Sequence, residues 1–285
     1  MRRLLLGMLR VREVHHRYAR TVALRGVSFE AARGVVGLLG LNGAGKTTLL
    51  RLIATTLRLQ RGQIEIAGHP VARVEMVRPL LGYLPQQFDF LKTATVAETL
   101  GFLAHLRGYR VTQKRIEAVL ERVGLAERPN ARVGELSGGM MRRLGLAQAL
   151  VHDPRLLIVD EPSAGLDPEG RVEMRRILAG LGEDRLVLMS THIAEDVMAT
   201  TRQLLVLHRG RLLYQGDLAA FIRRAKGAVF EGPPPPGEHL VTRTLGDGRV
   251  RYLARVPGPG AQPVPEPSLE DAFLYHVLVA QGEAS

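Results

Sequence analysis

The sequence predicts an α/β protein, and three observations carry that prediction. The chain has 285 residues, 46% of them hydrophobic and none of them cysteine, so it is neither a disordered chain nor a disulfide-stabilised scaffold. From about Arg10 to Phe221, short apolar runs alternate with amphipathic segments rich in Leu, Ala, Arg and Glu. Several of these runs are continuous for four or five residues, as parallel strands buried on both faces are.

The regular elements are expected in this order along the chain. Buried strands are predicted at residues 35–39, 156–159, 186–189 and 204–207, and the first two end in polar clusters. Between residues 94 and 151 the apolar spacing becomes helical, which predicts an all-helical insertion. There, Thr95-Val-Ala-Glu98 predicts a capping box at the start of one helix, and another helix carries an apolar stripe made by Ile116, Val119, Leu120 and Val123.

The composition changes after Lys226, because nine of the 16 prolines lie between Pro233 and Pro267. Residues 227–285 are therefore expected to form a proline-rich linker and a small α+β appendage, which the stiff linker would allow to sit away from the nucleotide and to touch a neighbour. Within it, residues 239–245 and 249–256 predict a hairpin around Gly246-Asp-Gly248.

The appendage is expected to end in a helix over residues 269–280, with Ser268 as its N-cap. A largely apolar stripe on this helix has to be buried, and we expect it to pack on the main domain or across a dimer. The stripe is made by Phe273, His276, Val277 and Ala280.

The charge balance indicates an anionic partner without identifying it. The chain has 39 Lys and Arg against 28 Asp and Glu, a formal net charge of +11. Nucleic acid, a membrane surface and nucleotide phosphate all fit this charge, and so does a solvated arginine-rich surface. No stretch approaches the roughly 18 to 20 apolar residues of a spanning helix, and Arg10 and Arg12 leave the N-terminal apolar run too short for a signal peptide. We expect a cytoplasmic protein.

A phosphate-binding loop is the strongest single motif. Gly40-Leu-Asn-Gly-Ala-Gly-Lys46-Thr47 fits G-x-x-x-x-G-K-[ST] between a predicted strand and a predicted helix, a context that a chance glycine-rich turn would lack. Its backbone N–H groups can surround phosphate oxygens, Lys46 can neutralise the β and γ phosphates, and the Thr47 hydroxyl can ligate Mg²⁺. The expected ATP-binding residues are Gly40, Asn42, Gly43, Ala44, Gly45, Lys46, Thr47 and Thr48.

Two acids follow the strand predicted at residues 156–159. Asp160 can hold Mg²⁺ directly or through water, and Glu161 can orient and deprotonate the attacking water. An apolar run that ends in Asp-Glu is weak by itself, because any strand ends at a polar turn. Together with the phosphate loop it predicts a nucleotide-hydrolysing site.

Further motifs give the chain a family resemblance. Leu136-Ser137-Gly138-Gly139-Met140 resembles the signature motif of the ATP-binding cassette (ABC) ATPases. Other matches fall in the family's order over roughly residues 10 to 225: Tyr18, Gln86, the segment 163–167 and Thr191-His192. Met140 stands where glutamine is usual and Ser163 where threonine is frequent; both variants also occur among cassette proteins that serve exporters, and neither residue is expected to take part in the chemistry.

The resemblance implies a P-loop ATPase core with an ABC-type antiparallel β subdomain and a helical subdomain. The nucleotide-binding domain would then cover residues 1–226, with the helical subdomain at about 94–151, and ATP would be the substrate. It also implies roles for individual residues: Tyr18 stacks on adenine; Glu161, His192, Gln86 and Lys46 are catalytic; Thr47, Gln86 and Asp160 bind Mg²⁺; Ser137, Gly138 and Gly139 bind the ATP of a partner chain; and Asp167 belongs to the D-loop.

Taken singly, some of these residues have ordinary alternatives. A lone histidine after a strand, such as His192, is more often structural, and Tyr18 would usually be a core aromatic. Gln86 is preferred to its neighbour Gln87 by analogy alone.

The signature segment also predicts the assembly. Ser137-Gly-Gly139 opens a helix and forms a second anion site, and one nucleotide is not expected to use both sites of one chain. We therefore expect a head-to-tail dimer with ATP between the two chains, and the resemblance favours a homodimer. A separate membrane permease is expected on the helical insertion, which would place the chain peripherally on the cytoplasmic face of the membrane.

Residues 267–274 resemble the tails of exporter ATPases, so export is favoured over import. A soluble ATPase acting on DNA or ribosomes is the first alternative. Such proteins have either a long coiled-coil insertion or two tandem cassettes, and this sequence has neither, so no nucleic acid partner is expected. A non-catalytic regulator is the second alternative, and it would be expected to lack Glu161 or His192.

Overall fold

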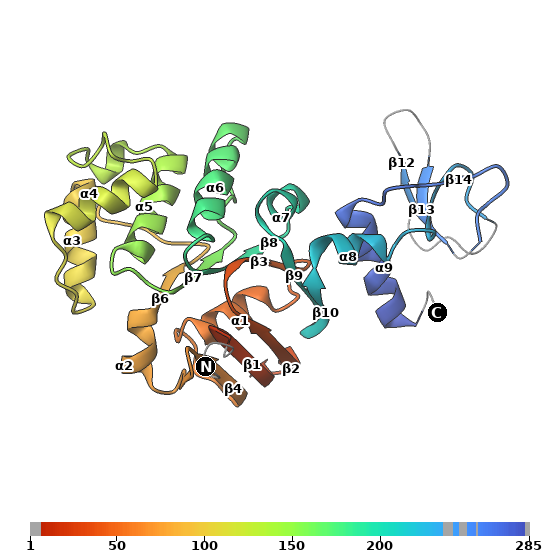
Figure 1. Cartoon of the computed structure of the whole chain (residues 1–285), viewed down its shortest axis with the longest axis horizontal. Helices are drawn as coiled ribbons and strands as arrows, with labels where there is room; N and C mark the ends of the chain where they lie inside the picture. The colour runs from red at the N-terminus through yellow and green to blue at the C-terminus, as the bar shows by residue number, and fades with distance from the viewer. Residues whose placement is uncertain (1–6, 236–241, 245–249, 255, 283–285) are drawn as a thin grey trace.

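The computed structural model describes residues 7–235, 242–244, 250–254 and 256–282 (Figure 1). Its centre is a six-stranded sheet in the order β10-β9-β3-β8-β7-β6. Five of its strands are parallel, and β10 pairs antiparallel with β9. The strands are β3 (Gly34–Leu39), β6 (Leu81–Leu84), β7 (Leu156–Asp160), β8 (Leu186–Thr191), β9 (Gln203–His208) and β10 (Arg211–Asp217). All four predicted buried strands are therefore confirmed, each one or two residues longer than expected.

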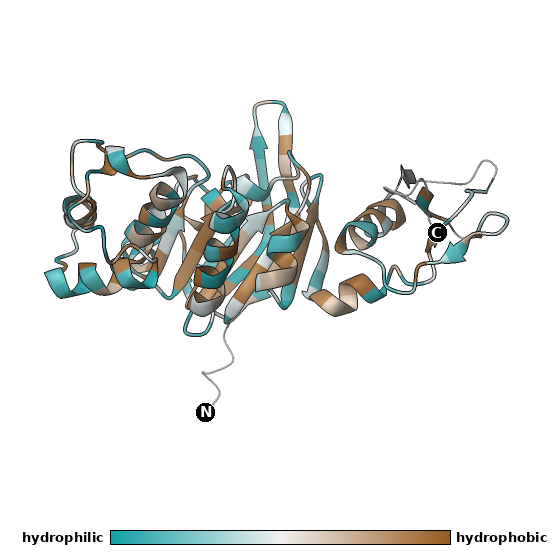
Figure 2. Ribbon diagram, turned by 90° about the horizontal axis from the view of Figure 1, so that it is seen from above, coloured by the Kyte–Doolittle hydropathy of each residue, from teal (hydrophilic) through white to brown (hydrophobic). Residues whose placement is uncertain are grey.

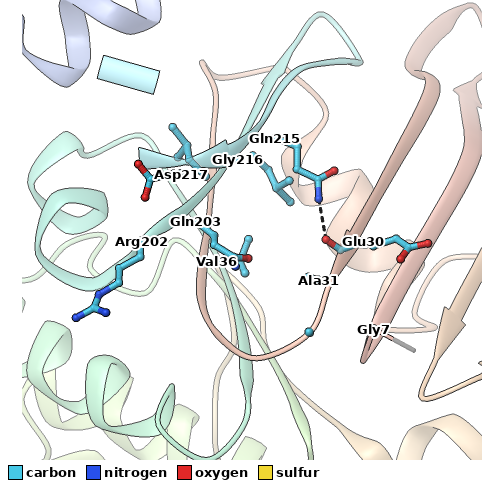
Figure 3. A pocket seen from close by; sticks show the side chains of 12 residues that line it. Gly7, Glu30, Ala31, Val36, Arg202, Gln203, Gln215, Gly216 and Asp217 are labelled. Carbon is cyan, nitrogen blue, oxygen red and sulfur yellow. Dashed lines mark hydrogen bonds between the residues drawn. The ribbon is translucent and has the colours of Figure 1, made fainter. Parts of the chain in front are cut away.

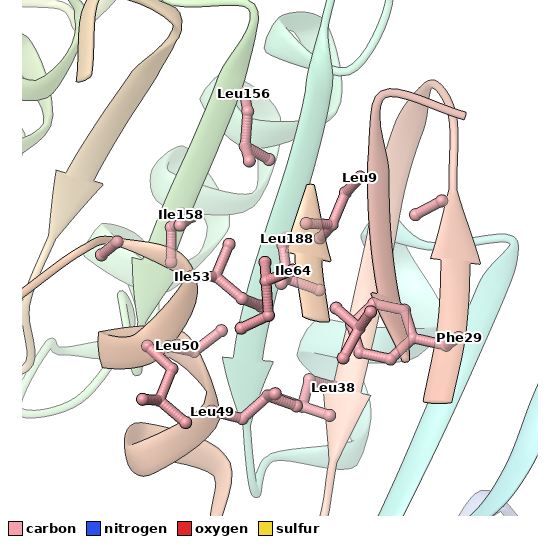
Figure 4. Packing of buried hydrophobic residues seen from close by; sticks show 14 of the residues in the cluster. Leu9, Phe29, Leu38, Leu49, Leu50, Ile53, Ile64, Leu156, Ile158 and Leu188 are labelled. Atoms are coloured by element: carbon pink, nitrogen blue, oxygen red, sulfur yellow. The ribbon is translucent and has the colours of Figure 1, made fainter. Parts of the chain in front are cut away.

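An antiparallel sheet covers the helix that follows the phosphate loop. It has the order β2-β1-β4-β5 and is formed by β1 (Leu9–Tyr18), β2 (Thr21–Ala31), β4 (Arg61–Ile66) and β5 (His69–Pro70). Its apolar face packs with α1 (Lys46–Ile53) and the six-stranded sheet, in a cluster that includes Leu9, Phe29, Leu38 and Ile64 (Figure 4). The amphipathic strands thus bury one face and present the other to solvent.

The helical insertion lies at the far edge of the six-stranded sheet, beside β6 (Figure 1). It contains α3 (Val96–Leu106), α4 (Gln113–Arg122) and α5 (Gly138–Leu150), and α2 (Val74–Val77) precedes it. The predicted capping box is present, because the Thr95 hydroxyl accepts a hydrogen bond from the Glu98 N–H and the Glu98 carboxylate accepts one from the Thr95 N–H. The predicted stripe of α4 is buried at Ile116, Val119, Leu120 and Val123.

After α5 the chain re-enters the sheet at β7. Helix α6 (Pro168–Leu181) then connects β7 to β8, and α7 (Ala194–Thr200) connects β8 to β9, before the C-terminal region begins. That region contains α8 (Leu218–Arg223), a small sheet and α9 (Leu269–Gln281). The small sheet has the order β12-β13-β11-β14, from β11 (Val229–Glu231), β12 (Thr242–Thr244), β13 (Val250–Leu253) and β14 (Gln262–Pro263). Strands β12 and β13 pair antiparallel as the predicted hairpin requires, and its turn at Gly246-Asp-Gly248 lies outside the described residues.

The C-terminal helix packs on the main domain, one of the two expected outcomes. Ser268 caps it as predicted, and its buried side chains share one hydrophobic cluster with Leu39, Val197, Leu204 and Phe221. The predicted stripe is wrong at one position: Ala280 is exposed, because the buried face continues through Leu269 and Ala272 in the first turn. The strands of the central sheet are largely hydrophobic (Figure 2). No helix in the described part of the chain is long and apolar enough to cross a membrane.

Candidate functional site

The carboxyl ends of three neighbouring parallel strands bring the predicted motifs to one edge of the sheet. Strand β3 runs into the phosphate loop, β7 ends at Asp160, and β8 ends at Thr191. The register pairs Leu39 with Thr191 and Asp160 with Ser190. In open parallel sheets, ligands bind outside the carboxyl ends of the strands. The phosphate loop, the acidic pair and His192 therefore converge there.

Glycine is required in the phosphate loop for two separate reasons. Gly43 and Gly45 have φ of 78° and 106°, in the left-handed region that glycine adopts without strain. At Gly40 a Cβ would lie 2.4 Å from the carbonyl oxygen of Leu207, and at Gly45 it would lie 2.6 Å from that of Ala23. The loop therefore exposes its backbone without side chains at these glycines. It ends at the N-terminus of α1, where backbone N–H groups can donate hydrogen bonds to an anion.

Lys46 is buried beneath this loop. Its Nζ donates to the carbonyl oxygen of Gly40 at 2.7 Å and lies 3.6 Å from Oε1 of Glu161. The ammonium therefore lies between the loop backbone and the acidic pair. Thr47 is exposed and Thr48 is half-buried.

Glu161 is the centre of the site's contacts. It is 5% exposed, and its Oε2 lies 2.8 Å from Nδ1 of His192, opposite the contact of Oε1 with Lys46. Its N–H donates to Oγ of Ser190 at 3.1 Å. Its φ is 51°, a left-handed value that costs a non-glycine residue about 1 kcal/mol or more and persists only where the surroundings hold it. The strained backbone and the two side-chain contacts fix the carboxylate in one place.

Asp160 has the character of a cation ligand. It is fully buried, and Oγ of Ser190 donates to its Oδ1, while its Oδ2 has no hydrogen-bond partner among the described residues. Burial together with the Asp160 carboxylate raises the pKa of nearby Tyr83 to about 12. A buried carboxylate oxygen without a partner is costly unless a cation or donor meets it. The described residues hold no group of three His, Asp or Glu that could bind a metal alone, so phosphate oxygens would have to complete a Mg²⁺ site.

The signature residues line a different cleft. Ser137 caps α5 by accepting a hydrogen bond from the Met140 N–H at 3.2 Å, and Asp167 caps α6 by accepting one from the Gly170 N–H at 2.8 Å. Both residues, with Gly138 and Gly139, line an open cleft of about 760 Å³. No residue of the phosphate loop lines this cleft. Within one chain, the structure does not bring the signature segment and the phosphate loop together.

Tyr18 and Gln86 are accessible but less constrained. Tyr18 ends β1 with 42% of its surface exposed, and its ring stands edge-on to His16 with the centroids 4.7 Å apart. Burial lowers the pKa of His16, so a neutral ring supports the tyrosine. Gln86 and Gln87 are both exposed, and the structure gives no preference between their side chains. The carbonyl oxygen of Gln86 accepts a hydrogen bond from Arg142 at 2.7 Å.

Sequence reasoning missed Ser190 and Arg142. Ser190 contacts both acids of the pair, and the signal available was that the apolar run of β8 ends in two hydroxyl residues, Ser190 and Thr191. Arg142 reaches from α5 to the carbonyl oxygens of Gln86 and Ala164, which ties the loop after β6 to the loop after β7. Burial lowers its pKa, an effect opposed by the charges of Asp160 and Glu161. Nothing in the local sequence distinguishes Arg142 from the arginine beside it.

A second open hollow, of about 650 Å³, lies away from these motifs (Figure 3). It is bounded by the end of β2 and by β9 and β10, and Nε2 of Gln215 donates to the carbonyl oxygen of Glu30 at 2.8 Å across it. Val36 and Gln203, which line it, stand near the amino ends of their strands. It is therefore not part of the nucleotide site.

Comparison with known proteins gives one consistent result. A family model described as "ABC transporter" matches residues 24–164. The chain is 38% identical over 226 residues to the uncharacterized ABC transporter ATP-binding protein YxlF of Bacillus subtilis (strain 168), with 78% of this chain and 75% of the relative covered. It is 41% identical over 301 residues to the Nod factor export ATP-binding protein I of Rhizobium meliloti (strain 1021), covering 93% and 86%. A solved structure of an ATP binding subunit of an ABC transporter matches with a TM-score of 0.67 and 28% identity, over 76% of this chain and 93% of the other.

Proposed function

This chain belongs to the ABC transporter family, and from that premise we propose that it drives export through a separate membrane permease by closing as a head-to-tail dimer on ATP. The family, the fold class and the ATPase activity predicted from the sequence are confirmed. The chain is an ATP-hydrolysing, nucleotide-binding subunit of a transporter. The direction of transport, the residue roles, the metal and the assembly belong to the proposal.

The contacts of Glu161 carry the proposed mechanism. Its carboxylate lies between Lys46 and His192, at the edge of the sheet where the phosphate loop ends. Glu161 accepts a proton from the attacking water, and His192 holds the carboxylate in position and can contact the γ-phosphate. Lys46, which lies against the Gly40 carbonyl oxygen, turns to the β and γ phosphates, because charge-assisted bonds to phosphate are stronger than a bond to a neutral carbonyl.

Mg²⁺ fits the donor set that remains. Oδ2 of Asp160 lacks a partner among the described residues, Thr47 is exposed at the loop, and Gln86 lies on the loop after β6. When bound with ATP, the ion would neutralise phosphate charge. Thr47, Asp160 and Gln86 are the residues proposed to hold it, directly or through water. Gly40, Asn42, Gly43, Ala44, Gly45 and Thr48 form the rest of the phosphate site, and Tyr18 supports adenine.

The separate signature cleft supports the dimer. Ser137, Gly138 and Gly139 line an open cleft of about 760 Å³ that no residue of their own phosphate loop lines. A head-to-tail arrangement supplies that loop from the partner copy, and Asp167 then lies at the junction of the two chains. We propose a homodimer because both half-sites are present in this one chain.

The helical insertion is the proposed permease surface. Phe102 and Leu106 on α3 are 61% and 64% exposed, and Leu106 lines a cleft of about 390 Å³ with Arg107 and Tyr109. Large apolar side chains grouped at the surface indicate a binding site for another protein. Docking there places the chain on the cytoplasmic face of the membrane. The names of relatives that state Nod factor export favour export for this chain, without assigning its cargo.

The domain division at residue 226 stays a prediction. Residues 1–226 hold every proposed catalytic residue, while residues 227–285 contribute α9 to a hydrophobic cluster shared with the main domain.

Membrane recovery of the full-length chain tests the docking surface. We expect Leu106→Glu to lower the fraction of tagged chain that sediments with membranes, while ATPase activity of the purified chain stays unchanged. Val256→Glu, which places the same charge at a 62% exposed position in the C-terminal region, is the matched control. Equal membrane recovery of the two variants would contradict docking on α3. Absence of ATP hydrolysis by the unmodified chain would contradict the proposed mechanism itself.

A further inference from the structure

The C-terminal helix α9 is held firmly against the main domain. Its N-terminus is closed by a capping box between Ser268 and Asp271, and Oδ2 of Asp271 pairs with Nη1 of Arg251 at 3.1 Å. One turn further along, the ring of His276 stacks on Phe221 of α8, with centroids 4.2 Å apart and planes 10° apart. These contacts fix both the position and the rotation of the helix.

This anchoring brings the first two turns of α9 to the nucleotide site. A cavity of about 270 Å³ is lined by Leu269, Phe273 and Leu274 on one side, and by Gly40, Leu41 and His192 on the other. The stiff linker would have allowed the appendage to sit away from the nucleotide, but α9 packs on the main domain, one of the two expected outcomes. Although the proline-rich segment separates the two regions along the chain, the helix after it returns to the phosphate loop.

The segment that carries His192 has little support of its own. The side chain of His192 is 50% exposed, and the helix after it, α7, has only seven residues and no side-chain N-cap. At its N-terminus the Ile193 N–H donates to Oγ1 of Thr191 at 2.9 Å, and Asp196 in the first turn pairs with Arg175 of the neighbouring α6 at 3.6 Å. A short helix is marginal without tertiary packing. Much of the support for this segment therefore has to come from its neighbours.

Helix α9 is one of those neighbours. Leu269 and Phe273 are 3% and 7% exposed, and they belong to the same buried cluster as Leu39 at the end of β3 and Val197 in α7. Ala194, the first residue of α7, packs against this cluster and also lines the cavity. The apolar face of α9 thus closes the outer side of the gap between the phosphate loop and the His192 segment.

We propose that Phe273 and Leu274 of α9 are positioning residues for ATP hydrolysis, which keep the His192 segment against the end of β3 so that the imidazole stays at Glu161. This inference rests on the proposed roles of Glu161 and His192. The two residues act through His192 and touch no reacting atom, so their removal lowers the rate of hydrolysis and leaves nucleotide binding largely intact. A displacement of about 1 Å at a catalytic group can lower a rate as much as a hundredfold.

The test compares positions on the same face of α9. In the full chain, Phe273→Ala and Leu274→Ala should each lower kcat, Phe273→Ala by roughly tenfold, with the KM for ATP within about twofold of the original. Leu278→Ala is the control, because Leu278 is buried in the same cluster at 8% exposure but does not line the cavity. It should lower the melting temperature without lowering kcat. Phe273→Leu, which keeps an apolar side chain at this position, should have a kcat close to that of the original chain. Leu274 is only partly buried, so Leu274→Ala can be compared with the original chain even if Phe273→Ala does not fold.

A double variant identifies the route of the effect. If Phe273 acts through His192, the double variant Phe273→Ala/His192→Ala should hydrolyse ATP at the same residual rate as His192→Ala alone. If the two residues act independently, the fold-losses in rate of the two single variants should multiply in the double variant. Multiplying effects would overturn the inference, and so would a kcat that falls equally in Leu278→Ala. His192→Ala at full activity would instead remove the proposed role of His192. A low rate in His192→Ala with unchanged Phe273→Ala and Leu274→Ala overturns the positioning role alone.

Discussion

We expect the replacement of Glu161 with glutamine to separate ATP binding from ATP hydrolysis. Glutamine keeps the volume of the side chain, but its amide has no basic oxygen that can accept a proton from water. General base catalysis contributes about 10²- to 10⁴-fold, equivalent to about 2.7–5.4 kcal/mol of barrier, so turnover should fall by that range. ATP remains bound because the phosphate loop is untouched, and the ATP-bound dimer should accumulate.

The contacts of Glu161 also predict a change in the stability of the ATP-free chain. Glu161 is 5% exposed and its Oε1 lies 3.6 Å from Nζ of Lys46, so its neutralisation leaves a buried ammonium with only neutral partners, the carbonyl oxygens of Gly40 at 2.7 Å and Leu41 at 3.4 Å. Losing one partner of a buried, hydrogen-bonded charge destabilises by about 1–3 kcal/mol. ATP should restore most of this loss, because its phosphates pair with Lys46.

Three measurements check these expectations: phosphate release at saturating ATP, ATP affinity by calorimetry, and melting temperature with and without ATP. Glu75→Gln, at an exposed position on α2, is the control for loss of a carboxylate. Turnover within about threefold of the original chain would refute the role of Glu161 as general base, since a base contributes at least about a hundredfold. Loss of ATP binding in Glu161→Gln would refute the separation of the two functions.

Further predictions address the assembly, the packing and the pH response. Ser137→Arg and Lys46→Ala should each be inactive alone, and a 1:1 mixture should recover up to about a quarter of the original ATPase activity by random pairing of a head-to-tail dimer; a fully inactive mixture argues against that dimer. Gly145→Ala should destabilise the fold by about 1–3 kcal/mol in denaturant unfolding, because its Cβ would lie 2.4 Å from the ring of Phe88, and unchanged stability would contradict that packing. Burial lowers the pKa of His276, with a further lowering by the Arg224 charge and an opposing hydrogen bond with the Phe221 backbone. The unfolded chain therefore binds the proton first, so stability is full above the ordinary histidine pKa of about 6.5 and falls as the pH drops below it. His276→Phe should weaken this acid-induced fall in melting temperature, and an identical pH profile would refute the assignment.

The elements of the main domain could be predicted because their signals are local. The β3 strand, the phosphate loop and α1 are consecutive, and a glycine-rich turn between a buried strand and a helix has few alternatives. The capping box at Thr95 and the N-cap at Ser268 are also local, since each involves residues within one turn. The buried stripe of α9 was less predictable: Leu269 and Ala272 in the first turn are buried and Ala280 is not. That choice depends on where the helix meets α8, which helical spacing alone does not encode.

The residues of the phosphate loop, the two acids that follow a buried strand and a second small-residue segment that opens a helix could all be identified from the amino-acid sequence. Tertiary structure alone decided which of these groups meet. Parallel pairing of β3, β8 and β7 placed Lys46, Glu161 and His192 together, whereas Ser137 lies in a cleft without a phosphate loop of its own chain. It also returned α9 to the His192 segment. These contacts join segments far apart in the sequence, and because such contacts are set by the packing of whole elements against one another, no local pattern specifies them.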